Sequence, residues 1–536
     1  MNVDPGGPRT LGGCLSNESP KPCTLAELRA TGYRPRSVKL ELRENLRRHL
    51  ETGKPWLEGI VGYEETVLPQ LERAILSQHD FILLGLRGQA KTRIVRQLVK
   101  LLDPWVPMVR GCPLRDDPLQ PTSAFSRRLF AERGETMPIE WLPREARYHE
   151  KLATPDVTIA DMIGDIDPIK AARERLDLAD ESAIHYGIIP RSNRGIFALN
   201  ELPDLQPRIQ VGLLNIMEEN DIQIRGFPIR IPLDLVLAFT ANPEDYTNRG
   251  NIITPLKDRI DSQIVTHYPR SIDDAIAITI QEAWLDRGPE IIVPRFMEEI
   301  LEEIAFVARS SDSVDQSSGV SQRLSIRARE LLVSAVERRV LLAPKEPRAP
   351  RLADLEAVVP AVTGRIELVY EGEQEGPLLV ANKLIGRAML KVFGRYFPPV
   401  YEQKPRQPRE RPRRRGEDPE QVRGEGRGEG RGEGRREDSD APPTAYRPVL
   451  SFFSSGSVVE LRDEMTAEEY RKTLDKVPGL SEIVTQHLGK QPDPVRALAM
   501  EWVLESLHQA SLVSRSSLDG KTRFSDMLAD MFSKGR

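Results

Sequence analysis

A lysine followed by a threonine, Lys91-Thr92, closes a short glycine-bearing turn in this sequence. The turn begins at Gly85, includes Gly88, and follows the apolar run Phe81–Leu84. This order predicts a strand, a phosphate-binding loop and a helix. Backbone N–H groups of small residues can turn inward toward an anion, and the start of the helix adds partial positive charge. Lys91 would reach the phosphates of a bound polyphosphate, and the Thr92 hydroxyl would ligate Mg²⁺.

The two residues before the lysine are Gln89 and Ala90, and both belong to the expected nucleotide contacts. Such loops carry glycine just before the lysine. An alanine methyl is tolerable there if φ stays negative, so the match to such loops is slightly degraded rather than broken. Val61 and Gly62, which precede a helix expected over residues 65–77, complete the candidate nucleotide-binding set.

Polar side chains also follow two apolar runs further along the chain. Residues 196–199 are followed by Asn200 and Glu201, and the mainly apolar stretch 233–240 is followed closely by Asn242. Because ligands bind at the carboxyl ends of parallel strands, we expect these side chains beside the phosphate loop. Glu201 would activate a water molecule as general base, Asn200 would orient an Mg²⁺-bound water, and Asn242 would position the attacking water.

The composition is that of a soluble globular protein. The chain has 536 residues, of which 39% are hydrophobic and 29% charged. A formal net charge of −5 gives no overall nucleic-acid signature, so nucleic acid is not an expected partner. The 3 cysteines are too few and too scattered for a disulfide framework. Neither a basic leader nor a long apolar run is present, so we expect a cytoplasmic protein without a membrane span.

Five segments are expected from changes of pattern along the chain. Residues 1–55 form an N-terminal extension, 56–270 an α/β core, and 271–398 an all-α lid. Residues 399–446, with a repeated RGEG and almost no apolar residue, are expected to be a disordered linker. Its glutamates offset its arginines, which argues against nucleic-acid binding. Residues 447–536 are expected to form a small helical module.

Alternation of strands and helices in the core predicts a mainly parallel sheet with helices on both faces. After the phosphate-loop helix, Trp105–Val109 is a candidate second strand. Residues 221–231, DIQIRGFPIRI, are expected to form a β-hairpin around Arg225-Gly226.

The ordered motifs resemble those of AAA+ ATPases of the magnesium chelatase ATPase-subunit and MoxR type, over residues 60–329. The stretches that carry the resemblance are the GxxGxAKT loop at 85–92, GDID at 164–167, HYGIIPRSNRGIFALNEL at 185–202, the hairpin at 221–231, FTANPEDY at 239–246, PLKDRID at 255–261 and GVSQRLSIR at 319–327.

The resemblance implies a P-loop NTPase core with an insertion in helix 2 and a pre-sensor hairpin, followed by a helical lid. It implies sensor 1 at Asn242 and an arginine finger at Arg259, which would face the γ-phosphate of the next subunit. For sensor 2, Arg323 is the better match and Arg327 the second. The implied cofactors are ATP and Mg²⁺.

The resemblance also implies ATP hydrolysis by a homo-oligomeric ring, a hexamer, that remodels or inserts metal into a client or metal-binding partner protein. One departure is that Asn200 stands where the family has its Walker B aspartate, which removes a negative charge near the metal. Three alternatives stay open: the motor of a magnesium chelatase proper, a sigma-factor-interacting transcription activator, and a low-turnover nucleotide-binding scaffold. The activator is disfavoured because the sequence has no GAFTGA-like loop, whereas Asn200 keeps the scaffold open.

Overall fold

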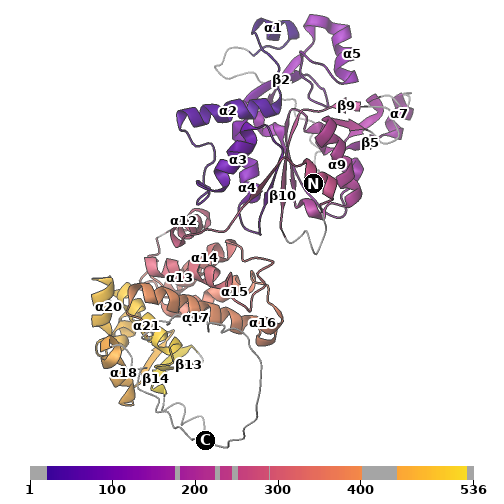
Figure 1. Cartoon of the computed structure of the whole chain (residues 1–536). Helices are drawn as coiled ribbons and strands as arrows, with labels where there is room; N and C mark the ends of the chain where they lie inside the picture. Colours follow the sequence, from indigo (N-terminus) through magenta and orange to yellow (C-terminus); the bar gives the residue numbers. More distant parts are fainter. Residues whose placement is uncertain are drawn as a thin grey trace, which may run out of the picture. The chain divides into compact units, whose positions relative to one another are not determined.

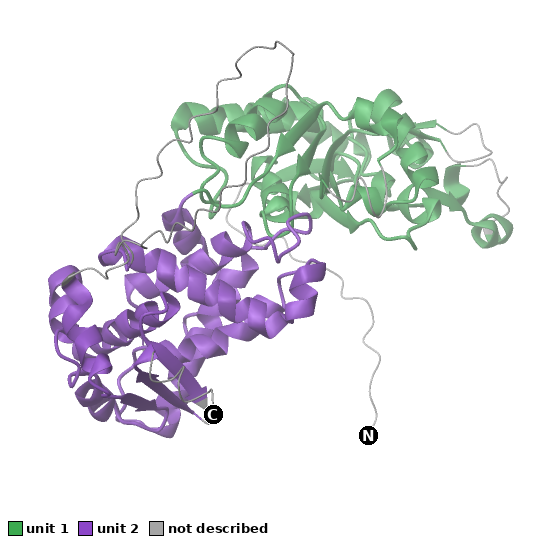
Figure 2. Ribbon diagram, turned by 60° about the horizontal axis from the view of Figure 1, so that its bottom comes forward, with its two compact units in different colours: residues 1–270 green, residues 271–536 purple. Residues whose placement is uncertain are grey.

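The computed structural model describes residues 21–174, 181–223, 230–243, 252–288, 290–400, 444–518 and 520–527. The chain divides into two compact units, residues 1–270 and 271–536, each of which is described by itself (Figures 1 and 2). The boundary coincides with the expected start of the lid. Within the described residues, no helix is both long and apolar enough to cross a membrane.

Unit 1 is built on a five-stranded sheet in which every neighbouring pair is parallel. The strand order is β11-β1-β10-β7-β4. The strands are β1 (Phe81–Leu84), β4 (Tyr148–Leu152), β7 (Gly195–Asn200), β10 (Leu235–Ala241) and β11 (Ser262–Val265). The central strands β1, β10 and β7 are almost wholly buried, which is why their sequences are apolar runs.

Alternate residues of these strands enter two hydrophobic cores, one on each face of the sheet. On one face pack α2 (Val38–Thr52), α3 (Val67–Leu76) and α4 (Lys91–Gln97). On the other face pack α9 (Pro207–Glu219) and α11 (Thr254–Arg259), as Figure 1 shows. The predicted α/β core, with a parallel sheet between two layers of helices, is confirmed.

The second strand that the sequence predicts, Trp105–Val109, lies outside the core sheet. Trp105–Val109 is a strand, β2, but it pairs antiparallel with β3 (Ile139–Pro143) outside the core sheet. The place beside β7 belongs to β4, which the sequence did not predict. Because β4 is an edge strand with half-buried polar residues, it lacks the apolar run that marks a central strand.

The region before and after β7 carries two small antiparallel ladders, of which the resemblance implied only the second, the hairpin expected over residues 221–231. One joins β5 (Gly164–Ile166) to β6 (Ile184–Tyr186), and the other joins β8 (Asp221–Gln223) to β9 (Arg230–Pro232). The turn of the second hairpin lies outside the described residues. The short helices of unit 1 are α1 (Leu25–Ala30), α5 (Ala124–Arg133), α6 (Ile159–Met162), α7 (Pro168–Glu174) and α8 (Ile188–Arg191).

The N-terminal extension, described from residue 21 onward, is docked on the core. Val38, Leu42 and Leu46 of α2 are buried against the sheet. Glu41 of α2 forms a buried ion pair with Arg147, with 2.6 Å between Oε2 and Nη2. A buried pair of this kind is costly to break, because one charge would be left without a partner. The helix therefore belongs structurally to unit 1.

The described residues of unit 2 form one set of helices before residue 401 and, from residue 444 onward, a second set of helices with a small sheet. The first set is α12 (Ile272–Glu282), α13 (Arg295–Ala308), α14 (Arg323–Leu342), α15 (Val359–Thr363), α16 (Tyr370–Glu375) and α17 (Pro377–Tyr396). The second set is α18 (Arg447–Ser454), β12 (Val459–Arg462), α19 (Ala467–Leu474), α20 (Leu480–Leu488), α21 (Asp493–Gln509), β13 (Ser514–Leu518) and β14 (Lys521–Ser525). The linker expected over 399–446 falls almost wholly outside the described residues.

The two sets of unit 2 share one hydrophobic core. Trp502 of α21 is fully buried and stacks on Phe296 of α13, with 4.9 Å between ring centroids. The Tyr446 hydroxyl donates to the Pro398 carbonyl at 2.7 Å, so the described residues on either side of positions 401–443 are in contact. The expected separate module is thus packed into the lid.

The C-terminal part also contains more than helices. It includes a three-stranded antiparallel sheet in the order β12-β14-β13, which the sequence analysis did not predict. The strands β13 and β14 are short and rich in polar residues, so their hydrophobic alternation is weak. The Asp519-Gly520 dipeptide between them is a hairpin signal that could have identified the pair.

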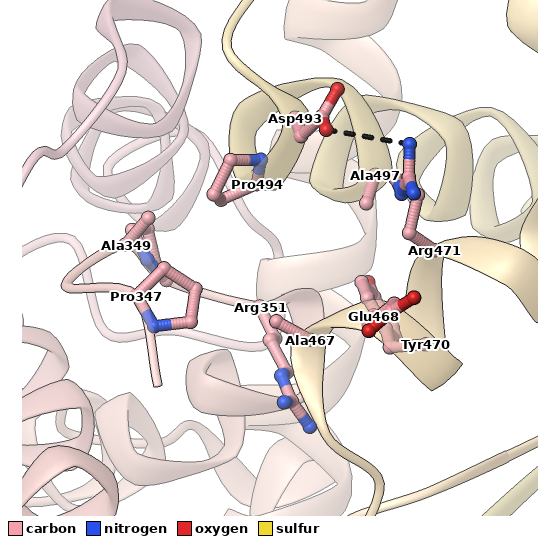
Figure 3. Close-up of a pocket in the computed structure, with 11 residues that line it drawn as sticks. Pro347, Ala349, Arg351, Ala467, Glu468, Tyr470, Arg471, Asp493, Pro494 and Ala497 are labelled. Carbon is pink, nitrogen blue, oxygen red and sulfur yellow. Dashed lines mark ion pairs between the residues drawn. The ribbon is translucent and has the colours of Figure 1, made fainter. Parts of the chain in front are cut away.

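A cavity of about 220 Å³ lies within unit 2 between residues 347–351 and the helices α19 and α21 (Figure 3). At its rim, Arg471 and Asp493 form an ion pair at 3.3 Å. The guanidinium of Arg351, also at the cavity, donates to Glu346 and to the Met465 carbonyl. Arg351, Arg471 and Asp493 are thus each paired with another group of the protein.

Beside this cavity, the buried carboxyl group of Glu501 connects α21 to the lid. The Tyr470 hydroxyl donates to Oε2 of Glu501, and the backbone N–H of Leu352 donates to the same atom at 3.3 Å. Burial raises the pKa of Glu501 to about 7 from an ordinary value of 4.5. The folded protein therefore holds this proton more tightly than the unfolded chain.

Stability should consequently fall as the pH rises from 4.5 to about 7, and then level off. The Glu501→Gln variant keeps an oxygen for both donors but has no proton to lose. Its stability relative to wild type should grow through this window, by up to roughly 3 kcal/mol. Calorimetric melting temperatures across the window would measure the effect. Glu468→Gln, at a surface carboxyl, is the control, and equal pH profiles for Glu501→Gln and wild type would contradict the expectation.

Candidate functional site

The segment expected to be the phosphate loop begins after β1 and leads into α4. The Gly85 N–H donates to the Ala241 carbonyl at 3.1 Å, which ties the start of the loop to β10. A Cβ at Gly85 would overlap the Thr266 hydroxyl and the Gln89 side chain, so only glycine fits there. Gly88 has φ of 77°, a left-handed conformation that glycine adopts readily. Both glycines are thus required by the observed backbone.

Ala90 does not meet the condition of a negative φ. Its φ is 57° and its ψ is 13°, so it lies in the left-handed region. For an L-residue this conformation costs about 1–2 kcal/mol, because Cβ approaches the following carbonyl oxygen. The loop needs a left-handed residue just before α4, and this sequence supplies alanine where glycine would be unstrained.

Lys91 is the first residue of α4, and only 7% of it is exposed. Its ammonium group donates to the carbonyl oxygens of Gly85 and Leu86, the latter at 3.1 Å. The positive charge therefore lies inside the loop, where it would face any anion that the backbone N–H groups bind.

Thr92, Asn200 and Glu201 come together at the carboxyl ends of β7 and β10. Oδ1 of Asn200 accepts hydrogen bonds from the hydroxyl groups of Thr92, at 3.5 Å, and Thr240, at 3.2 Å. The backbone N–H of Glu201 donates to the Thr240 hydroxyl at 3.2 Å. Thr240 was not among the predicted residues, although it lies on the predicted strand. The Thr240 hydroxyl contacts Asn200 and the Glu201 N–H, and Asn200 in turn contacts Thr92 at the start of α4.

Glu201 has φ of 55° and ψ of 50°, which is uncommon outside glycine and asparagine. Strained conformations of this kind concentrate at functional sites, where the surrounding structure holds them. Asn242 follows β10, and its Oδ1 is buried without a hydrogen-bond partner within the described residues. Such an atom calls for a water molecule or a ligand group. The roles of Glu201 as general base and of Asn242 in positioning the water stay predictions.

The predicted arginines lie in two different units. Arg259, at the end of α11, pairs with Glu218 of α9, with 2.7 Å between Nη2 and Oε2. Arg323 is exposed at the first position of α14, whereas the Arg327 guanidinium pairs with Glu330. Arg323 is therefore the less constrained candidate for sensor 2.

The loop is also held by three residues that the sequence analysis missed. The Tyr63 hydroxyl lies 3.1 Å from the Gln89 carbonyl and 2.7 Å from the His267 carbonyl. The Thr266 hydroxyl donates to Oε1 of Gln89 at 2.6 Å, and the Tyr268 hydroxyl donates to the Arg87 carbonyl at 3.0 Å. Thr266 and Tyr268 follow β11, a strand that the sequence analysis did not predict, so the rule that ligand-site residues end parallel strands could not be applied to them.

The predicted contacts at Val61 and Gly62 immediately precede Tyr63. Gly62 has φ of 81°, which accounts for glycine at this position. Both residues are partly exposed, so their backbone can meet a ligand.

The available oxygen atoms fit a magnesium ion held partly by phosphates. Thr92 supplies a hydroxyl and Asn200 an amide oxygen, and both are hard oxygen ligands. No cluster of three or more His, Cys, Asp or Glu side chains suited to a metal was found in the described part of the chain. Mg²⁺ in nucleotide sites needs only one or two protein ligands besides phosphates and water.

Comparison with known proteins gave no match to any family model. The chain is 28% identical over 242 residues to the magnesium-chelatase 38 kDa subunit of Cereibacter sphaeroides, covering 43% of this chain and 65% of that protein. It is 27% identical over 245 residues to the same subunit of Rhodobacter capsulatus, covering 45% and 63%. The match thus spans just under two thirds of these curated relatives. A shorter match, 29% over 123 residues, is to the hydrogenase transcriptional regulatory protein HoxA of Cupriavidus necator, covering 23% of each chain.

Among solved structures, a complex of the magnesium chelatase subunits BchI and BchD aligns with 59% of this chain and 97% of that chain, at 20% identity and a TM-score of 0.32. A putative ATPase from Cytophaga hutchinsonii covers 67% and 97%, at 15% identity and a TM-score of 0.27. These scores are too low to carry an argument, so the assignment depends on the sequence relatives together with the motif order and sheet. Over these stretches the chain is similar in sequence to the magnesium-chelatase 38 kDa subunits, in agreement with the resemblance carried by its motifs.

Proposed function

We propose that this protein binds ATP with Mg²⁺ and hydrolyses it. The observation that carries the proposal is the hydrogen-bonded set of Thr92, Asn200, Thr240 and Glu201 beside the phosphate loop. A hydroxyl at the start of α4 and a carboxylate at the end of β7 are side chains that phosphoryl transfer uses at this edge of the sheet, and the Asn200 amide keeps an acceptor oxygen where an aspartate is usual.

Each residue has a distinct task in this proposal. The backbone N–H groups of residues 85–92 and the Lys91 ammonium bind the phosphates. Thr92 and Asn200 hold Mg²⁺, which when bound neutralises charge on the phosphate oxygens. Glu201 accepts a proton from the water that attacks the γ-phosphorus, as the bond to the ADP oxygen breaks. The buried Oδ1 of Asn242 orients that water.

Assembly into a homo-oligomeric ring, a hexamer as in the family, belongs to the same proposal. Arg259 would act on the ATP of a neighbouring subunit, and Arg323 would act as sensor 2 from the lid. The work of the ring would be to remodel a client protein, or to load metal into a metal-binding partner. The motor of a magnesium chelatase proper is the nearest variant of this function. Support comes from the relatives at 28% and 27% identity and from the order of the motifs.

Asn200 favours a second candidate, a nucleotide-binding scaffold with negligible turnover. The amide keeps an acceptor oxygen, but it lacks the negative charge that aspartate would place near the metal. We therefore expect weakened rather than absent Mg²⁺ binding, because Thr92 and the phosphates still coordinate the ion.

Asn200→Asp should lower the Mg²⁺ concentration that gives half-maximal ATP hydrolysis. Restoring one charge next to the ion adds a charge-assisted interaction worth roughly 1.5–3 kcal/mol, or about 10- to 100-fold in Mg²⁺ concentration. Steady-state ATPase rates of wild type and variant across a Mg²⁺ titration measure this, with Lys91→Ala as the control that should not bind ATP. If wild type is inactive at every Mg²⁺ concentration and Asn200→Asp becomes active, the natural protein is the scaffold.

A further inference from the structure

Two residues beside the phosphate loop, Tyr63 and Thr266, both form hydrogen bonds to Gln89. Tyr63 contacts the Gln89 carbonyl, and Thr266 contacts the Gln89 side chain. Gln89 immediately precedes Ala90, the loop residue with a left-handed backbone next to Lys91. Two hydroxyl groups from distant parts of unit 1 therefore converge on the residue beside the strained one.

The Gln89 carbonyl belongs to the peptide group that joins Gln89 to Ala90. Rotation of this peptide would change φ of Ala90, so a hydrogen bond to its oxygen resists relaxation to negative φ. The Tyr63 hydroxyl has one proton, which it shares between the Gln89 carbonyl at 3.1 Å and the His267 carbonyl at 2.7 Å. The second bond, from Thr266 to Oε1 of Gln89, holds the same residue through its side chain. Thr266 is itself fixed, because its N–H donates to the Leu84 carbonyl at 2.7 Å.

These groups are buried and remain in the form that the contacts need. Tyr63, Gln89 and Thr266 are 6%, 7% and 4% exposed, so water competes little for the hydrogen bonds. Burial raises the pKa of Tyr63 to about 12, and its hydroxyl therefore stays a donor at neutral pH. The Tyr63 and His267 rings pack edge to face, with 4.9 Å between centroids, which fixes the tyrosine ring.

We propose that Tyr63 and Thr266 are positioning residues that hold Ala90 in its left-handed conformation and so keep the loop ready to bind ATP. The hydrogen bonds supply what a glycine before Lys91 would otherwise provide through its conformational freedom. This inference depends on the proposed ATP binding. Residues that do not contact the nucleotide would then determine how strongly the protein binds ATP.

Tyr63→Phe and Thr266→Val should each weaken ATP binding by about 3- to 10-fold, as expected for loss of one buried hydrogen bond. The decisive variant is Ala90→Gly, which removes the strain at its source. Adding it to Tyr63→Phe should restore the affinity to within about twofold of Ala90→Gly alone. Calorimetric titration with ATP measures binding without requiring turnover, and melting temperatures report the fold of each variant.

Tyr33→Phe is the matched control, because the Tyr33 hydroxyl bonds to Asp117 in unit 1 rather than to the loop. Its ATP affinity should equal that of wild type. If Tyr63→Phe costs as much affinity with glycine at position 90 as with alanine, or costs none in either, the positioning role is overturned. Thr266→Val serves the same comparison if Tyr63→Phe fails to fold. If wild type itself binds no ATP, the proposed function fails, and this inference fails with it.

Discussion

Replacing Arg259 with alanine should lower ATP turnover by about 10³-fold or more while leaving ATP affinity nearly unchanged. Within one chain, Arg259 lies against Glu218 on α9, and 31% of its side chain is exposed. It is thus available to a neighbouring molecule. An arginine supplied by a neighbour stabilises charge that develops only during phosphoryl transfer, so its loss affects the rate more than binding. Steady-state ATPase assays and calorimetric titration with ATP separate the two effects.

Mixing Arg259→Ala protein with Lys91→Ala protein should recover part of the activity. In a mixed ring, some interfaces combine an intact phosphate loop from one variant with an intact arginine from the other. Glu218→Gln is the control, since it removes the partner of Arg259 without removing the arginine. A normal rate for Arg259→Ala, or no recovery on mixing, would refute action between subunits.

Glu201→Gln should nearly abolish hydrolysis, by about 10²- to 10⁴-fold, while ATP still binds. Glutamine has the same shape but cannot accept the proton of the attacking water. The backbone contact to Thr240, made by the N–H group, is unaffected by the change. ATPase assays test the rate, and size-exclusion chromatography with ATP tests whether the variant assembles into a ring.

Glu219→Gln is the matched control for this prediction, because Glu219 is an exposed carboxylate at the end of α9. It should hydrolyse ATP at the wild-type rate. Substantial hydrolysis by Glu201→Gln would exclude Glu201 as the general base. If the ATP-bound variant does assemble, it is also the form in which a client protein should be captured and identified.

The parts of the fold that could be predicted are those marked by local pattern. The buried strands β1, β7 and β10 have apolar sequences because helices cover both faces of the sheet. β4 and β11 border the sheet and are partly polar, and neither was predicted. An edge strand has one unpaired side and more contact with water, so its sequence carries less hydrophobic signal.

In the candidate site, too, some residues could be predicted from the sequence and others could not. Lys91, Thr92, Asn200 and Glu201 could be found because a loop or strand end places each one. The bracing by Thr266 could not, since it joins residues 177 apart in sequence through a single hydroxyl. The conformation of Ala90 was also beyond the sequence, because a left-handed alanine is disfavoured locally and persists only through contacts made elsewhere in the fold.

The hydrogen bond between Tyr446 and Pro398 joins two residues that are 48 apart in sequence. Residues of the lid and of the C-terminal part enter the same hydrophobic core, so the two parts form one folding unit rather than two. We therefore expect the two parts to unfold together, in one cooperative transition.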